Sequence, residues 1–399
     1  MRATRAFAST ARRAWNSRRI PSPQVHERGA MAEARGNLLE IDGSFGEGGG
    51  QILRTALTLA VALGRPFRMR RIRAGRPTPG LRPQHLLAVR AAAALCNATV
   101  EGDRIGSQDL LFAPQCRPTG GDYTFDVGAT EAGGSAGAVS LVFQTLFLPL
   151  SLVGAPSRLT LVGGTHVPWS PPFHYLAHVY LPAVARLGFA ADLALERWGW
   201  YPKGGGIVHA HIRPRQHVAL DTPSGEGAEP TLDWTRRGRI AHIWGISAAS
   251  NLPAHIIQRQ KAQALETLRK AGLRAEIDEV EAPAVGFGTV VFLVAEYERG
   301  LGGFTAYGAL RKPAERVAEE AARELVRSHE TKAAVDEHLA DQLLLPAVLT
   351  GAAVAFTTPR ATDHLRTNAW TIEQFLGTRV DIEPHPTGAL VRVRGAGVA

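Results

Sequence analysis

Cysteine is almost absent from this sequence of 399 residues. Only Cys96 and Cys116 occur, which is too few for a disulfide framework or a cysteine-rich metal site. The zinc patterns HExxH and CxxC are missing as well, so zinc-dependent hydrolysis has no support. We expect a protein of the cytoplasm whose chemistry depends on other side chains.

Acidic residues are scarce at the amino terminus. Residues 1–36 hold eight Arg and only two Glu, so the rest of the chain is only mildly basic and its bulk charge does not by itself indicate a nucleic-acid partner. The Arg-rich composition is typical of a mitochondrial presequence; the alternative is a start codon assigned too early, with Met31 as the first residue. In either case we expect 1–36 to be a disordered or mis-assigned extension outside the fold.

Long apolar runs are also few. The stretch 136–155 is apolar enough to resemble a membrane span, but Gln144 and Pro149 lie inside it and no second span follows. We interpret it as a buried core helix and expect no membrane partner.

What the sequence does contain is an internal repeat. Three apolar helices are predicted at 48–64, 133–150 and 336–351. Each is followed by a β-rich stretch, a second helix with a histidine near its start (His85, His174 and His364), and closing strands. We predict an α/β (α+β) fold in which three units of two helices on a small sheet share one core.

A segment of different patterning interrupts the repeats. Residues 225–332 alternate strands and amphipathic helices after a Ser/Gly/Pro-rich loop. We predict a smaller inserted α/β domain at 225–332, between units two and three. The three repeats then occupy 37–224 and 333–399.

The glycine-rich segment DGSFGEGGGQILRTA, residues 42–56, is the strongest local signal for chemistry. Glycines followed at once by a helix expose backbone N–H groups that attract phosphate. Glu47 is a candidate ligand for a divalent cation, and Arg54 a partner for an oxyanion. A simple turn that starts a helix is the alternative.

Two further loops have both a functional and a structural interpretation. The segment 70–85 carries Arg73, Arg76 and Arg82 on a stiff loop, and guanidinium groups suit phosphate oxygens; a solvated surface loop is the alternative. The Pro-aromatic loop at 163–176 offers a surface for a nucleobase or simply packs against its neighbours.

The carboxyl-terminal part brings HLADQ (338–342) and ATDHLRTN (361–368). We predict Asp363 as the N-cap of a helix that starts beside His364. The positive end of that helix would keep the imidazole neutral, as a nucleophile requires. A histidine with only a structural role is the alternative.

These motifs, in this order, resemble the RNA 3'-terminal phosphate cyclase family over about residues 38–398. The resemblance rests on GEGGGQILR, IRAGR with PGLRPQH, GGTHVP with SPPF, YPKGGG, HLADQLLLP and DHLRTN. It implies three repeats of a two-helix, four-stranded unit with an inserted smaller α/β domain. It also implies ATP as substrate, Mg²⁺ or Mn²⁺, and an RNA with a 3'-terminal phosphate as partner.

Carried over residue by residue, the resemblance makes His364 the catalytic nucleophile that forms a covalent histidine–AMP intermediate. Glu47 is then the metal-associated carboxylate. The phosphate-handling positions are Arg54, Arg73, Arg76 and Gln84. The ATP-binding positions are Gln144, Pro171, His338, Leu339, Ala340, Asp341 and Gln342, with Asp341 on the ribose and Pro171 against the adenine.

Two departures from the family pattern and three rival interpretations stay open at this point. Position 338 is His where the family commonly has Tyr, and the loop ahead of Gln144 is longer than usual. The closest rival is a non-catalytic cyclase-like RNA-binding protein in ribosome assembly, against which His364 argues. An enolpyruvyl transferase would need six such units, and a plain RNA-binding module has no RRM or KH signature here.

Overall fold

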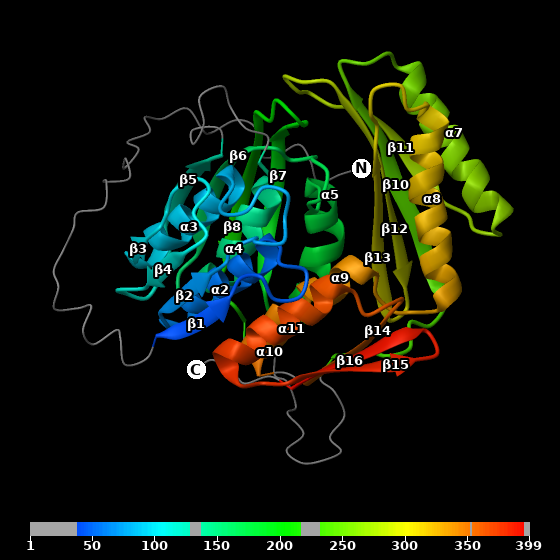
Figure 1. Ribbon diagram of the computed structural model, residues 1–399. Helices are drawn as coiled ribbons and strands as arrows, with labels where there is room; N and C mark the ends of the chain where they lie inside the picture. Colours follow the sequence, from blue (N-terminus) through cyan, green and yellow to red (C-terminus); the bar gives the residue numbers. More distant parts are fainter. Residues whose placement is uncertain (1–37, 128–136, 217–231, 352, 395–399) are drawn as a thin grey trace.

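The computed structural model describes residues 38–127, 137–216, 232–351 and 353–394. The N-terminal extension and part of the long loop ahead of Gln144 lie outside them. Across the described residues the strands form four sheets of four strands each, with helices packed between and against them (Figure 1). The predicted mixed α/β class is confirmed. None of the described helices is long and apolar enough to cross a membrane.

Three of the four sheets follow one topology. The first unit contains β1 (Leu39–Asp42), α2 (Gly50–Leu63), β2 (Phe67–Arg70), α3 (Pro83–Cys96), β3 (Thr99–Glu101) and β4 (Leu110–Ala113). The second contains β5 (Asp122–Asp126), α4 (Val139–Ser151), β6 (Ser157–Gly163), a helical segment, β7 (Ala190–Arg197) and β8 (Gly206–Arg213). In each sheet the unit's first strand pairs in parallel with its second, and its last strand pairs antiparallel with both the second and the third.

The third unit is built in the same way but begins earlier than the sequence indicated. It contains β9 (Leu232–Trp234), α9 (Glu337–Gln342), α10 (Leu344–Thr350), β14 (Ala353–Thr358), α11 (Asp363–Leu376), β15 (Val380–His385) and β16 (Gly388–Arg394). Strand β9 lies within the range 225–332 that we expected for the insertion, yet it pairs in parallel with β14. The insertion therefore interrupts the third unit after its first strand, and does not lie between units two and three.

Two predicted helices are less regular than expected, and proline explains both. The helix expected over 336–351 is divided into α9 and α10, because Pro346 has no N–H to donate to the carbonyl of Gln342. The second helix of unit two runs as α5 (Phe173–Tyr175), a π-helical segment (Leu176–Tyr180) and α6 (Leu181–Ala185). Pro182 interrupts the α-helical pairing there in the same way.

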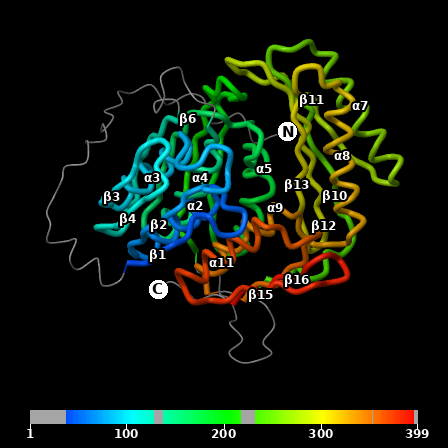
Figure 2. Tube along the Cα trace, viewed as in Figure 1, coloured from blue at the N-terminus to red at the C-terminus, as the bar shows by residue number. Residues whose placement is uncertain are grey.

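Helix α2 lies at the centre of the repeats. It packs against α3, α4 and α11, so it contacts helices of all three units (Figure 2). Helix α4 is buried along its whole length except at Gln144, which is partly exposed. The apolar stretch that resembled a membrane span is therefore a core helix, as predicted.

The insertion is a four-stranded sheet covered by two helices. It contains β10 (Ile240–Ser250), α7 (His255–Lys270), β11 (Glu276–Glu281), β12 (Gly288–Tyr297), β13 (Gly300–Tyr307) and α8 (Ala314–Thr331). Along β12, Val291 and Leu293 face the insertion's own core with α8, whereas Val290 and Phe292 join the core shared by the repeats. Both faces of β12 are therefore buried, and the insertion packs against the core of the repeats.

Asp336 joins the insertion to two of the repeats. Its carboxylate is 3% exposed and caps α9 by accepting hydrogen bonds from the backbone of His338 and Leu339 at 2.8 and 3.0 Å. It also accepts one from the Tyr175 hydroxyl at 2.9 Å and one from Gly303 N in β13 at 3.0 Å. One buried carboxylate thus fixes the start of α9 against the second unit and the insertion.

Asp336→Asn should lower the free energy of unfolding by about 2–4 kcal/mol. The reason is that the NH₂ group of the asparagine would face a buried backbone N–H, so that two donors meet without an acceptor. Tyr175→Phe removes a single donor and should cost about 1 kcal/mol. Urea unfolding of both variants provides the measurement. Equal midpoints for Asp336→Asn and the unsubstituted chain would contradict the role of Asp336.

A group of histidines is buried where the second unit meets the insertion. His166 stacks on Trp198 with 4.0 Å between ring centroids and lies 2.9 Å from His174 Nδ1 through its Nε2. Burial lowers the pKa of His174 to about 3 and that of His166 well below its usual value. Burial and nearby arginines likewise lower the pKa of His85 to about 3.

These neutral histidines should make the protein sensitive to acid. Because their pKa values are lower in the folded chain, their contribution to stability is complete above pH 6.5 and is lost as pH falls from 6.5 toward 3. For one such histidine the loss between pH 7 and pH 5 is roughly 2 kcal/mol.

His174→Gln should reduce the difference in unfolding free energy between pH 7 and pH 5 by that amount in urea titrations. His255→Gln, at an exposed position, is the matched control and should leave the difference unchanged. The idea fails if both variants show the same pH dependence as the unsubstituted chain.

Candidate active site

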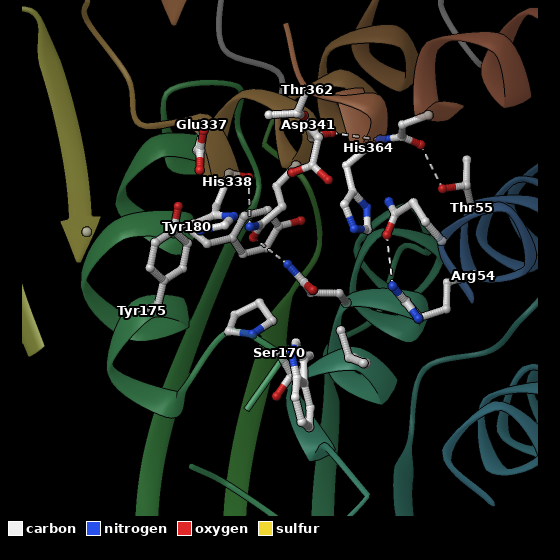
Figure 3. A pocket seen from close by; sticks show the side chains of 18 of the residues that line it. Arg54, Thr55, Ser170, Tyr175, Tyr180, Glu337, His338, Asp341, Thr362 and His364 are labelled. Carbon is white, nitrogen blue, oxygen red and sulfur yellow. Dashed lines mark hydrogen bonds between the residues drawn. The ribbon is translucent and has the colours of Figure 1, made fainter. Parts of the chain in front are cut away.

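A cavity of about 770 Å³ opens where the three repeats and the insertion meet. Its wall includes α2 of the first unit, α4 and the Pro-aromatic loop of the second, α9 and the start of α11 of the third, and β13 and α8 of the insertion. Figure 3 shows Arg54, His338, Asp341 and His364 converging on it from different elements. No single unit could form this site alone.

The glycine-rich loop is held against α11. Gly46 has a φ of 56°, and a side chain there would collide with Thr367 Oγ1. The Glu47 amide donates to the same hydroxyl at 3.3 Å, and Phe45 stacks on Trp370 with ring centroids 4.0 Å apart. Glycine is required here because the loop backbone lies directly on the helix that carries His364.

His364 lies in the first turn of α11 with half of its side chain exposed toward the cavity. The N-cap is Thr362, whose hydroxyl accepts from Leu365 N at 3.1 Å, and not Asp363 as predicted. The backbone of Thr362 is extended, as an N-cap requires, whereas Asp363 is already the first residue of the helix. Burial, together with Arg54 and Arg76, lowers the pKa of His364, whereas Asp341 and Asp363 oppose that shift.

Glu47 lies directly beside the histidine. Its Oε2 is 2.7 Å from His364 Nε2, and its other oxygen forms an ion pair with Arg76. The Oε2 atom is shielded from solvent, and its geometry to the ring nitrogen is not that of a hydrogen bond. A buried carboxylate oxygen with unused lone pairs, next to a ring nitrogen, is a suitable ligand for a hard divalent cation.

Asp341 of α9 and Arg54 of α2 line the cavity on either side of His364 (Figure 3). Burial raises the pKa of Asp341 to about 6, although His364, His338 and Arg54 oppose the shift. Burial also lowers the pKa of Arg54 to about 10. The Arg54 guanidinium donates to Gln51 at 2.8 Å and lines the cavity. An anion bound in the cavity would therefore contact a desolvated guanidinium cation.

Five of the seven predicted ATP-binding positions line the cavity, namely Gln144, Pro171, His338, Asp341 and Gln342. Gln144 donates to Gln342 at 2.6 Å, and Gln342 donates to the His338 carbonyl at 2.8 Å. Pro171 lies in the opposite loop, whose Trp169 is 95% exposed. Leu339 and Ala340 belong to α9 and are fully buried, so their side chains do not line the cavity.

The predicted phosphate-handling positions are only partly brought together. Arg54 lines the cavity, and Arg76 reaches its edge through Glu47. Arg73 instead donates to the carbonyls of Thr78 and Gly80, both at 2.9 Å, and shapes its own loop. Gln84 accepts from Ala138 N at 3.4 Å and does not line the cavity either.

The insertion contributes residues that the sequence analysis did not single out. Tyr307 and Thr305 of β13 and Glu324 of α8 line the cavity. The Tyr307 hydroxyl is buried without a hydrogen-bond partner among the described residues. Ligand atoms of Glu324, Glu337 and His338 lie within 4.8 Å of one another, in an arrangement that could hold a cation. The Arg360 guanidinium donates to both carboxylate oxygens of Glu337, to Oε1 at 2.9 Å. No local motif marks Tyr307, Thr305 or Glu324.

The three repeat-related histidines differ in their surroundings. His85 is 4% exposed, and its Nδ1 accepts from Arg82 N at 3.2 Å. His174 is tied to His166, as described above. Of the three, His364 is the one that lines the cavity described above.

Comparisons with known proteins identify the family of the chain. The family model described as RNA 3'-terminal phosphate cyclase matches residues 45–382. The chain is 48% identical to the RNA 3'-terminal phosphate cyclase of Methylococcus capsulatus over 90% of this chain and 97% of that protein. It is 46% identical to the one from Nostoc sp. over 85% of this chain and 94% of that protein, and 40% identical to the one from Archaeoglobus fulgidus over 87% and 98%. The chain therefore belongs to the RNA 3'-terminal phosphate cyclase family.

Proposed function

We propose that this protein uses ATP to convert an RNA 3'-terminal phosphate to a 2',3'-cyclic phosphodiester, with His364 as the nucleophile. Family membership supports an ATP-dependent enzyme of the ligase type. The observation that supports the site assignment most strongly is the position of His364, half exposed in a cavity that Arg54 and Asp341 also line. We place the reaction in the cytoplasm, as composition indicates.

Three transfers would complete the reaction. A neutral ring nitrogen of His364 attacks the α-phosphorus of ATP, pyrophosphate leaves, and a phosphorus–nitrogen bond forms. An oxygen of the RNA 3'-phosphate then attacks the same phosphorus and releases the histidine, which gives an RNA adenylate. Finally the neighbouring 2'-hydroxyl loses its proton and attacks the activated phosphate, and AMP leaves. The lowered pKa of His364 favours the neutral imidazole that the first step needs.

The surrounding residues fit positions along a nucleotide. We assign the phosphates to the start of α2 and to Arg54, because backbone N–H groups and a desolvated guanidinium both favour negative charge. Asp341 would accept hydrogen bonds from the ribose, and the adenine would lie between Pro171 and His338. An imidazole offers less stacking surface than the usual Tyr, so His338 should weaken the preference for adenine.

A divalent cation, Mg²⁺ or Mn²⁺, is part of this proposal. Glu47 would hold it, because its Oε2 is buried without a hydrogen bond at the edge of the phosphate region. When bound, the ion would neutralise charge on the triphosphate. The ion pair with Arg76 holds the Glu47 carboxylate in place at the wall of the cavity.

Incubation with α-phosphate-labelled ATP and divalent metal, without RNA, should label the protein through an acid-labile, alkali-stable bond. His364→Ala should abolish this label while leaving the urea unfolding midpoint unchanged, because a half-exposed side chain adds little to packing. His255→Ala, at an exposed position outside the cavity, is the control and should label normally. Retained label in His364→Ala would disprove the assignment.

Glu47→Gln should slow this labelling on the order of a hundredfold and shift its metal dependence to higher concentration, because the amide binds a cation more weakly than a carboxylate does. The measurement is the initial labelling rate against Mn²⁺ concentration. Glu40→Gln, which removes a carboxylate from a surface ion pair with Arg70, should change neither quantity. An unchanged metal dependence in Glu47→Gln would place the ion elsewhere.

A further inference from the structure

A second cleft, of about 680 Å³, lies where the chain enters and leaves the insertion. Arg236 and Arg237 follow β9 on the way in, and Lys332 follows α8 on the way out. The remaining wall comes from the β15–β16 hairpin, including His385 and Arg392. We call this the hinge cleft. It does not share any residue with the cavity around His364.

The charge of the hinge cleft is almost entirely positive. Within the described parts of the chain, no carboxylate lies within ion-pair distance of Arg236, Arg237 or Lys332, whereas Arg392 pairs with Glu383 at 2.6 Å. Arg236 and Lys332 are exposed on the rim. Three cations around a concavity, without a matching acid, produce a local potential that attracts anions.

A second feature of the hinge cleft, besides its net charge, is the environment of the Arg237 side chain. Its guanidinium lies 4.5 Å above the Tyr297 ring, and burial lowers its pKa. Its Nη1 is shielded from solvent and has no hydrogen-bond partner among the described residues. A buried charged donor without an acceptor is unfavourable. Phosphate oxygens are acceptors that suit a guanidinium well.

The hinge cleft is connected to the catalytic region through the end of β14. Thr357 donates to the carbonyl of Thr235 at 3.3 Å, and its own carbonyl accepts from Ala334 N at 3.1 Å. The chain continues from Thr357 through Arg360, which lines the active-site cavity, to His364. Seven peptide links of at most about 3.6 Å place His364 no more than about 25 Å from Thr357.

We propose that the hinge cleft binds backbone phosphates of the RNA substrate, upstream of the 3' end that reacts. This inference rests on the proposed function for its ligand, because a linear polyanion ending at His364 must leave the cavity across neighbouring surface. Exposed cations at the rim and a guanidinium inside fit contacts with phosphates and carry no base specificity. The insertion thereby contributes to substrate binding at both clefts.

The test uses the full chain with a double variant, Arg236→Gln with Lys332→Asn. Both side chains are exposed, and Asn tolerates the left-handed backbone of Lys332, whose φ is 65°. The matched control, Arg104→Gln with Arg274→Gln, removes the same charge from exposed positions that do not line the cleft. The probe is an RNA of about 15 nucleotides with a 3'-phosphate, which at a stacked rise of about 3.4 Å per nucleotide is longer than the distance to His364.

The cleft variant should bind this RNA roughly tenfold more weakly at about 0.1 M salt, and its slope of log K against log salt should fall by about 1.4, or about 0.7 for each lost phosphate contact. The control should match the unsubstituted chain in both quantities. The KM for the long RNA should rise in the cleft variant. The KM for a dinucleotide with a 3'-phosphate should not change, because neither substituted residue lines the cavity around His364.

Three outcomes would overturn the proposal. Equal weakening in the cleft and control variants would mean that only overall charge matters, and equal effects on the long RNA and the dinucleotide would place the change at the active site. If the cleft variant loses calorimetric binding of inorganic phosphate but binds RNA normally, the cleft holds a free anion instead. Labelling by ATP without RNA should be unchanged in the cleft variant. If the unsubstituted chain is not labelled by ATP, the proposed function is refuted. That result leaves the hinge cleft to be judged separately, because RNA binding is measured directly.

Discussion

The structure depends on one buried carboxylate. Asp336 accepts hydrogen bonds from Tyr175 of the second unit, Gly303 of the insertion and the first turn of α9. Burial of this kind is unfavourable unless each lone pair finds a donor, and here the donors come from three separate parts of the chain. Any movement of one part relative to the others would leave a buried charge or an N–H without its partner. The relative positions of the second unit, the insertion and α9 are therefore strongly restricted.

That restriction reaches the active-site cavity through α9. With its first turn fixed by Asp336, α9 presents the His338 carbonyl to Gln342, and Gln342 accepts from Gln144 of α4. On the other side, the fit of Gly46 against Thr367 fixes the glycine-rich loop to α11. The residues around His364 are thus held by contacts within the chain itself, and such preorganisation is what the phosphoryl transfer that we propose would require.

The sequence predicted the features that recur within it and the features set by local chemistry. Repetition revealed the three units, and local chemistry predicted a helix that starts beside His364, although its N-cap is Thr362 and not Asp363. The sequence did not reveal β9. This strand has only three residues and is separated from its sheet partner β14 by the whole insertion, so it carries no periodic signal. Strand β13 was missed because its glycines have low strand propensity. The pairing of Tyr175 with Asp336, 161 positions apart, is a consequence of packing that no local pattern encodes.

The point at which the insertion interrupts the third unit explains how it can serve the site from two sides. Both of its ends meet β14, because Thr235 and Ala334 each hydrogen-bond to Thr357. Strand β14 leads directly to His364, so an insertion at this point needs no long linker to approach the reacting group. Strand β13 and helix α8 of the insertion bring Tyr307 and Glu324 to the wall of the cavity around His364, while the connecting segments bring their cations to the separate hinge cleft.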